Sequence, residues 1–290
     1  HRPQLRGSPR AQPAARLRVV ALVVTVPPAP GPALSLLIIK PGLHTTVQDR
    51  GRPGYRAWGV PVGGAFDVHA HDLANALVGN EPDAATLELT LQGGTFEAAD
   101  HLAIALAGAP MEAIVRGADG SERALSIPRS LTLRAGDRLT LGGTPIGART
   151  YLAAAGGWSR PVVLGSRSEE APVEAGDRLA ASPGTVAERR PADVGPLVPS
   201  DGLLRIVLGP DAAALGLADP DAWEGRHARV SGQSNRMGLR LEGADEWPTD
   251  PLPDRISAPV APGAVQLAGG RLIVLGVACG TMGGYPHVAQ

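Results

Sequence analysis

The sequence predicts a mainly β protein, a barrel or sandwich of strands that carries a few short helices. Its 290 residues include 38 glycines and 28 prolines, which interrupt long helices and favour short strands joined by tight turns. Apolar residues occur in short runs punctuated by Gly, Pro and Asp, as is typical of strands. The chain does not alternate strand-like and helix-like segments, as a parallel α/β sheet would. These observations also exclude a helical bundle or a coiled coil.

Two helices interrupt the predicted strands. Asp67 can cap a helix over Val68–Val78, since apolar residues recur along one side of it and Gly79 can supply a left-handed end. A second, short helix is expected near Asp211–Leu217. The predicted strands are Leu36–Ile39, Leu102–Ala107, Ala113–Arg116, Ser130–Leu133, Arg138–Leu141, Thr150–Ala154, Leu204–Leu208 and Arg271–Val277.

Composition divides the chain into four parts. Residues 1–34 are rich in Arg and Pro, and their apolar stretch is too short to span a bilayer, so we expect a disordered leader rather than a signal peptide. Residues 35–180 are predicted to form a larger N-terminal subdomain, and residues 200–290 a smaller C-terminal one. Residues 181–199 are proline-rich without apolar periodicity and are predicted to link the two subdomains.

Charge and residue counts exclude several classes of protein. A net charge of −1 and 3% aromatic residues provide neither a basic surface nor stacking platforms, so we expect neither nucleic acid nor a membrane as partner. The one lysine, Lys40, precedes Pro41 and cannot serve a phosphate-binding loop of the GxxxxGK[ST] type. The lone Cys279 lies in an apolar run and is expected to be a buried structural thiol.

No metal site is expected. His69 and His71 are two residues apart, whereas metal ligands on one face of a helix are usually four apart. We therefore expect both histidines on the helix surface.

The densest polar cluster follows the strand-like residues Thr45–Val47. Gln48, Asp49 and Arg52 fall at or just beyond the end of that segment, where a turn lets side chains converge. An amide, a carboxylate and a guanidinium can hold a small polar substrate such as an amide, a urea or a carboxylate, so these three are candidate catalytic residues. The alternative is that an Asp49–Arg52 ion pair fixes the turn.

Other polar residues are candidates for substrate binding if the fold brings them together. Gly64 and Asp67 belong to a glycine-rich loop that enters the first helix, where backbone N–H groups can approach an anion. The remaining candidates follow strand-like segments or sit in turns and are Ser166, Arg167, Arg236, Thr281 and Tyr285.

At these motifs the chain resembles the allophanate hydrolase subunit 2 family, also called the biotin-dependent carboxyltransferase family or the family of 5-oxoprolinase C subunits. The resemblance runs in family order from about residue 36 to the end. It rests on Lys40–Tyr55, Gly59–Pro61 with Gly64, Ala65 and Asp67, Asn75–Asn80, Leu87–Glu88, Tyr151–Ala153 with Gly156–Gly157, Leu164–Ser168, Arg236–Gly238, Gly263–Gln266 and Gly283–Pro286. It adds Gln266 to the candidate substrate-binding residues.

The resemblance implies a cyclophilin-like β-barrel architecture and a cytoplasmic hetero-oligomer with companion subunits. It implies a lactam hydrolase subunit of the 5-oxoprolinase type, which opens 5-oxoproline to glutamate with ATP used at the level of the complex. The alternatives are a carboxyltransferase subunit that transfers carboxyl groups from biotin to urea or a related amide, and a non-catalytic regulatory partner.

The chain departs from the family pattern at several positions. Gly63 replaces a serine, Glu169 a threonine and Met282 a threonine, while Ala278 and Gly280 stand where relatives have Asp and Gln. A glycine-rich segment before residue 175 is largely missing, and relatives continue beyond residue 290. These departures motivate the non-catalytic alternative. They also lead us to expect that the chain is a divergent copy or a fragment of a family member.

Overall fold

The computed structural model describes residues 34–182, 185–191, 202–243, 247–249 and 255–290. The predicted leader lies outside this range except for Leu34, and so does most of the predicted linker. The division into leader, two subdomains and linker stays a prediction. The first eleven strands are β1 (Leu34–Lys40), β2 (Thr45–Gln48), β3 (Thr86–Thr90), β4 (Thr95–Ala98), β5 (Leu102–Gly108), β6 (Ala113–Arg116), β7 (Glu122–Leu125), β8 (Arg129–Leu133), β9 (Arg138–Leu141), β10 (Arg149–Ala154) and β11 (Arg178–Ala181).

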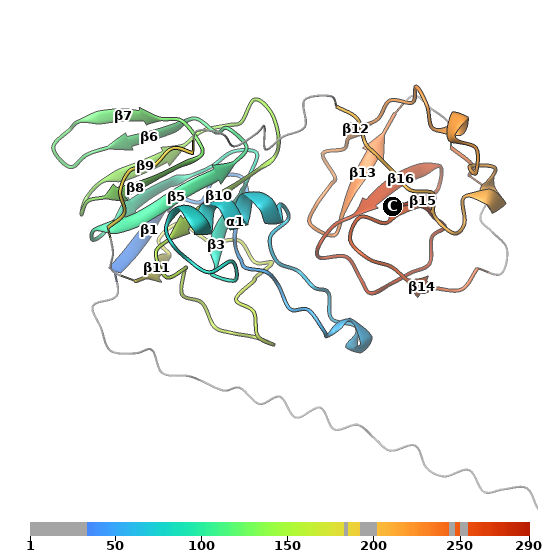
Figure 1. Ribbon diagram of the computed structural model, residues 1–290, viewed down its shortest axis with the longest axis horizontal. Coiled ribbons are helices and arrows are strands. Elements are labelled where there is room, and N and C mark those ends of the chain that lie inside the picture. The colour runs from blue at the N-terminus through green and yellow to red at the C-terminus, as the bar shows by residue number, and fades with distance from the viewer. Residues whose placement is uncertain (1–33, 183–184, 192–201, 244–246, 250–254) are drawn as a thin grey trace, which may run out of the picture. The chain divides into compact units, whose positions relative to one another are not determined.

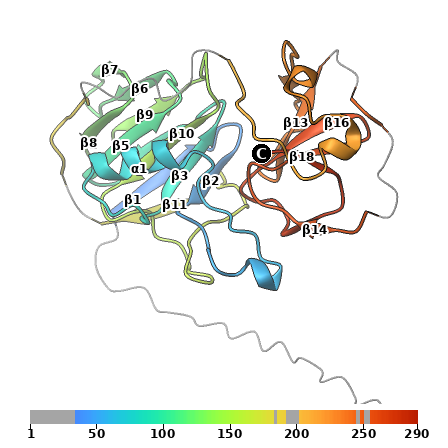
Figure 2. The ribbon, with the colours of Figure 1, turned by 45° about the vertical axis from the view of Figure 1, so that its right-hand side comes forward.

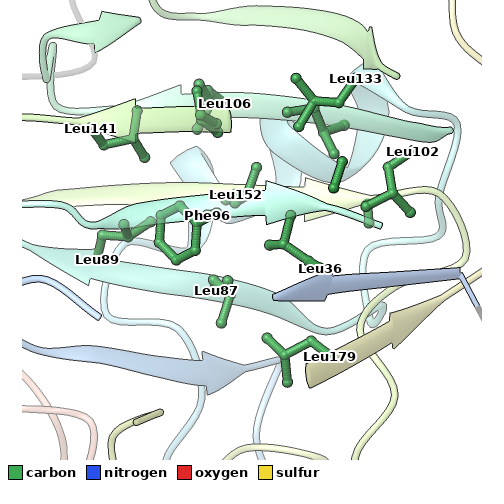
Figure 3. Packing of buried hydrophobic residues seen from close by; sticks show 14 of the residues in the cluster. Leu36, Leu87, Leu89, Phe96, Leu102, Leu106, Leu133, Leu141, Leu152 and Leu179 are labelled. Carbon is green, nitrogen blue, oxygen red and sulfur yellow. The ribbon is translucent and has the colours of Figure 1, made fainter. Parts of the chain in front are cut away.

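These strands form two antiparallel sheets that share one core. The first sheet has the order β11-β1-β4-β9-β6-β7 and the second β2-β3-β10-β5-β8. Alternate residues of both sheets enter the same apolar cluster, and Figure 3 shows Leu36 and Phe96 of the first sheet beside Leu87 and Leu152 of the second. This alternation is what two sheets packed face to face require.

The second sheet is covered on its other face as well. All seven residues of β5 are buried, because Leu102, Ile104 and Leu106 face the shared core while Ala107 packs under helix α1. Figure 1 shows α1 (Val68–Leu77) lying along β5 and β10. On β3 and β10 the same alternation places Glu88 and Tyr151 on the helix side of the sheet.

Helix α1 confirms the predicted helix to within one residue. Asp67 caps it by accepting from the Ala70 N–H at 3.0 Å, and Gly79 has a φ of 77° beyond its end. The prediction that both histidines lie on the surface is wrong for His71. Its ring is fully buried and lies 2.9 Å from both the Thr86 hydroxyl and the Pro82 carbonyl.

His71 predicts a specific loss of stability in acid. Burial lowers the pKa of His71 below 6.5, so the unfolded chain takes up a proton first as the pH falls. We expect the free energy of unfolding to drop below pH 6.5 with a slope of at most about 1.4 kcal/mol per pH unit. Urea unfolding from pH 7.5 to 5.5 measures it. Replacing His71 by glutamine should remove the contribution of His71 to the slope of unfolding free energy against pH. An equal reduction of that slope in His69→Gln, at an exposed position of the same helix, would contradict the assignment to His71.

The sequence repeat Ala-Gly-Asp-Arg-Leu, at residues 135–139 and 175–179, forms the same turn twice. Gly136 and Gly176 have φ values of 83° and 95°, and Asp137 and Asp177 each accept a hydrogen bond from the N–H three residues earlier. Each turn leads directly into a strand, β9 and β11 respectively. Common turn chemistry thus accounts for the repeat.

The C-terminal strands form a separate antiparallel sheet, β12-β13-β16-β15-β18, and a two-stranded pair, β14-β17. In sequence β14 lies between β13 and β15, and β17 between β16 and β18. Figure 2 labels β13, β14, β16 and β18 of this part of the chain. Their own apolar cluster includes Val265, Leu272 and Val288. The bounds are β12 Arg229–Val230, β13 Gly238–Glu242, β14 Ala258–Pro259, β15 Val265–Ala268, β16 Arg271–Leu275, β17 Met282–Gly283 and β18 His287–Ala289, with short 3₁₀ turns at Arg56–Trp58, Ala213–Leu215 and Pro220–Ala222.

The prediction of a mainly β fold with few helices is confirmed, although two predicted elements are wrong in detail. Leu204–Leu208 is not a regular strand; only Leu208 bridges to Ala289, and Pro210, which has no N–H to donate, follows closely. The predicted helix near Asp211–Leu217 shrinks to a 3₁₀ turn. Within the described residues the strand orders are open, so the sheets form layers and do not close into a cylinder.

Candidate functional site

Asp49, a predicted catalytic residue, is held inside a closed set of hydrogen bonds. Its side chain is 4% exposed and accepts from the hydroxyls of Ser166 and Ser168, both at 2.6 Å. It also accepts from the N–H groups of Gly51 at 2.7 Å and Arg167 at 2.5 Å. These four donors fill the usual acceptor positions of a carboxylate. The group therefore joins the turn after β2 to the loop around residue 166.

Gln48 and Arg52 bind to the same loop. The Gln48 amide donates to the Glu169 carbonyl at 2.7 Å, while its buried oxygen has no partner in the described structure. The Arg52 guanidinium donates to the carbonyls of Val163 and Ser168. An Asp49–Arg52 ion pair, the alternative from the sequence, is not formed among the described contacts. Gln48, Asp49, Arg52, Ser166 and Arg167 are thus brought together, with the Arg167 side chain exposed.

Two carboxylates lie at the N-terminal end of helix α1. The Asp67 side chain accepts from Ala70 N, and Glu88 accepts from the Phe66 N–H at 2.7 Å. These two carboxylates disfavour a second anion at this end of the helix. Gly64 has a φ of 82°, and a Cβ there would come within 2.7 Å of the Gly51 nitrogen. The glycine is therefore needed because the backbones of residues 64 and 51 lie close together, which explains it without a substrate.

Glu88, which is not among the candidate residues, is the centre of a buried charge network. It is 1% exposed and accepts from the Tyr151 hydroxyl at 2.7 Å and from the Arg236 guanidinium at 2.5 Å. The Arg149 guanidinium lies 3.4 Å from it. Burial, and after it the charge of Glu88, raises the pKa of the Tyr151 hydroxyl, which stays protonated and donates. The only sequence signal for Glu88 is the Leu87–Glu88 pair of the family resemblance.

Arg236 connects this network to the C-terminal sheet. It is 4% exposed and also donates to the Gly64 carbonyl at 2.6 Å and to the Glu170 carboxylate at 2.9 Å. Burial acts to lower the pKa of Arg236, but Glu88 and Glu170 outweigh burial and raise it, so the guanidinium is charged. Its sequence neighbours Asn235 and Met237 line a cavity beside β13.

We call this space, about 210 Å³ in volume, the Gln266 cavity. Gln266 is 4% exposed and donates from its amide to the Tyr285 carbonyl at 3.1 Å. An amide and the exposed guanidinium of Arg240 can hydrogen-bond a small amide or a carboxylate, so this cavity is the best candidate for substrate contact. It is lined by Asn235, Met237, Gly238, Arg240, Val260, Gln266, Ile273, Leu275, Cys279, Gly280, Met282 and Tyr285.

Two departures from the family pattern, Gly280 and Met282, lie on the wall of this cavity. They replace polar side chains and leave the wall rich in sulfur, with Met237 and Cys279 nearby. Cys279 is 2% exposed, as predicted, and burial raises the pKa of its thiol while Arg56 acts in the opposite direction. The proximity of Arg56 to Cys279 comes from tertiary structure, since 223 positions of sequence separate them.

The candidate residues therefore fall into four places. Asp49 lies with four others, Gln48, Arg52, Ser166 and Arg167, at the turn after β2 and the loop around residue 166. Gly64, Asp67 and Arg236 lie around Glu88 and Tyr151. Gln266 and Tyr285 line the Gln266 cavity. Thr281 lines a neighbouring cavity that shares Val260 and Met282 with it. The roles assigned to these residues from the sequence stay predictions.

Residues 58–290 match the sequence family described as carboxyltransferase domain, subdomain A and B. The chain belongs to this family. The carboxyltransferase domain is 37% identical over 265 residues to the C subunit of 5-oxoprolinase from Escherichia coli, covering 88% of this chain and 83% of that protein. It is 36% identical over 132 residues to urea amidolyase of Lachancea kluyveri, covering 45% of this chain and 7% of that protein.

Solved structures agree with the family assignment. The crystal structure of TTHA0988 matches the carboxyltransferase domain with a TM-score of 0.74 and 31% sequence identity over 90% of this chain. The matched part is 52% of TTHA0988, so this chain spans about half the length of that protein.

Two kinds of feature are absent from the described residues. None of the helices there is long and apolar enough to cross a membrane. Those residues also contain no group of three or more His, Cys, Asp or Glu side chains placed to hold a metal ion.

Proposed function

We propose that this carboxyltransferase domain is a subunit of a cytoplasmic, ATP-dependent 5-oxoprolinase that opens the lactam of 5-oxoproline to glutamate together with companion subunits. One observation carries the proposal. The sequence similarity to the 5-oxoprolinase C subunit extends over most of both proteins, whereas the sequence similarity to urea amidolyase of Lachancea kluyveri covers 45% of this chain and 7% of that protein.

The Gln266 cavity is the proposed contact for the lactam. A lactam has one N–H donor and one carbonyl acceptor, and the Gln266 side chain carries the complementary pair. Because a lactam is a poor electrophile, its carbonyl oxygen must be activated before water attacks the carbon, and this is the step that consumes ATP.

The nucleotide is assigned to a companion subunit. The sequence lacks a phosphate-binding loop of the GxxxxGK[ST] type, and the carboxylates of Asp67 and Glu88 lie at the start of α1. In this proposal the carboxyltransferase domain binds and orients the lactam, and no step through the nucleotide is assigned to its residues.

Reconstitution tests the proposal. The full chain, mixed with the companion subunits of a 5-oxoprolinase, is expected to release ADP and glutamate in equal amounts only when 5-oxoproline is present. A mixture without this chain is the control and should be inactive. Failure of the complete mixture to release ADP in response to 5-oxoproline would overturn the proposal.

A carboxyltransferase that uses biotin and urea is the second candidate, favoured by the urea amidolyase match. In this candidate the biotin is carried by another protein, since Lys40 lacks the Met-Lys context of a biotin carrier. Urea-dependent consumption of carboxybiotin by the purified chain, with no response to 5-oxoproline, would favour it. A non-catalytic role is favoured by Gly280 and Met282 in the cavity wall and predicts that the companion subunits are fully active alone.

A further inference from the structure

The C-terminal sheet presents one of its two faces to the Gln266 cavity. Successive residues of β16 point to opposite faces, so that Leu272 belongs to the apolar cluster of the C-terminal strands while Ile273 and Leu275 line the cavity. The same alternation on β15 brings Gln266 to the cavity side of the sheet. The cavity therefore lies over side chains that neighbouring strands hold in fixed register.

That register places Arg240, Ile273 and Gln266 in one row. Arg240 of β13 is directly opposite Ile273 of β16, and Ile273 is directly opposite Gln266 of β15. Residues directly opposite each other in antiparallel strands carry their side chains on the same face. The Cα atoms of Arg240 and Gln266 are therefore about 10 Å apart, which is twice the spacing of neighbouring strands, and Ile273 lies between them.

Both polar ends of this row can bind a ligand. The Arg240 backbone is held because its N–H donates to the Ser234 hydroxyl at 3.0 Å, while its exposed guanidinium has no ion pair within the part of the chain that the structure describes. The Gln266 amide nitrogen donates to the Tyr285 carbonyl, but its oxygen accepts no hydrogen bond among the described contacts. That oxygen is not sealed from solvent, unlike the unpartnered oxygen of Gln48.

The cavity lining fits a compact ring that carries a carboxylate. Among the described residues that line the cavity, Arg240 alone is charged, so the cavity favours an anion over a cation. Ile273 separates the guanidinium from the amide with an apolar surface, which suits the CH₂ groups of a ring. In 5-oxoproline the carboxylate is bonded to the ring carbon next to the lactam nitrogen. Urea has neither a charge nor an apolar body.

From these observations we infer that Arg240 binds the carboxylate of the substrate, while the Gln266 oxygen accepts the lactam N–H, and that Arg240 thereby selects 5-oxoproline over urea. The inference rests on the proposed function, because 5-oxoproline is the substrate assigned there. Arg240 contacts a group of the substrate that does not react. It should therefore strengthen binding of the substrate and of the transition state equally, which lowers KM and leaves kcat nearly unchanged.

Calorimetric titration of the full chain compares 5-oxoproline with 2-pyrrolidinone, the same lactam ring without the carboxylate. We expect the wild-type chain to bind 5-oxoproline about 10-fold more tightly, which is the low end for a hydrogen bond to a charged group because the guanidinium is exposed to water. Arg240→Gln should remove this preference and bind 2-pyrrolidinone as the wild type does. Arg240→Lys keeps the charge and should retain part of the preference.

Arg229→Gln is the matched control. Arg229 is an exposed arginine of the neighbouring strand β12 and does not line the cavity, so its replacement should leave the preference for 5-oxoproline unchanged. The inference is overturned if the wild-type chain shows no such preference, if Arg240→Gln retains it, or if Arg229→Gln loses it as well.

Kinetics of the reconstituted complex distinguish this inference from the proposed function. In an active complex Arg240→Gln should raise the KM for 5-oxoproline about 10-fold and leave kcat nearly unchanged. An active complex whose KM does not respond to Arg240→Gln would overturn the inference alone. An inactive complex, together with an Arg240-dependent preference in the binding experiment, would overturn the proposed function alone.

Discussion

Replacing Arg236 by methionine is expected to lower the free energy of unfolding by about 3–5 kcal/mol. The substitution removes the guanidinium that bonds Glu88 and the Gly64 carbonyl, and it leaves a carboxylate that is 1% exposed without its shortest partner. An uncompensated buried charge is among the few causes of losses this large. Urea unfolding of the full chain, monitored by circular dichroism, measures the change.

A double-mutant cycle distinguishes the contribution of the Arg236–Glu88 ion pair to the unfolding free energy from the contribution of packing. Glu88→Gln removes the charge, so Glu88→Gln combined with Arg236→Met should be more stable than the sum of the two single losses predicts. Arg116→Met is the matched control, because the Arg116–Glu122 pair is exposed and an exposed pair contributes only about 0–1 kcal/mol. Equal losses in Arg236→Met and Arg116→Met would contradict the assigned role of Glu88.

Replacing Asp49 by alanine is expected to cost about 3 kcal/mol or more, because four donors lose a charged acceptor at once. Two of these donors are backbone N–H groups that cannot turn away. The loop around Ser166 should therefore detach from the turn after β2 before the core unfolds, and amide hydrogen exchange at Gly51 and Arg167 should become faster.

This result distinguishes a structural carboxylate from a catalytic one. If Asp49 acts only in catalysis, Asp49→Ala should remove activity and leave the unfolding free energy and the exchange rates unchanged. Asp72→Ala is the control, since the Asp72 carboxylate is paired with Arg50 at the surface, and we expect it to cost less than about 1 kcal/mol. The closed set of donors around Asp49 leads us to expect the structural result.

The sequence by itself determined the local elements of this carboxyltransferase domain. Helix α1 and strands such as Arg138–Leu141 follow from apolar spacing, a capping Asp and a following glycine, all of which act within a few residues. Both Gly-Asp turns were predictable for the same reason. The family was identifiable because its motifs are short, ordered stretches of sequence.

Tertiary structure decided what the polar residues do. Nothing near Glu88 or Arg236 in the sequence indicates that they meet, since 148 positions separate them. His71 is buried because the side of α1 that carries it packs against β3. The spacing of the two histidines in the sequence did not reveal this contact. Arg56 and His287 line one cavity for the same reason, because burial and hydrogen bonding depend on all the neighbours of a side chain, and most of those neighbours are distant in sequence.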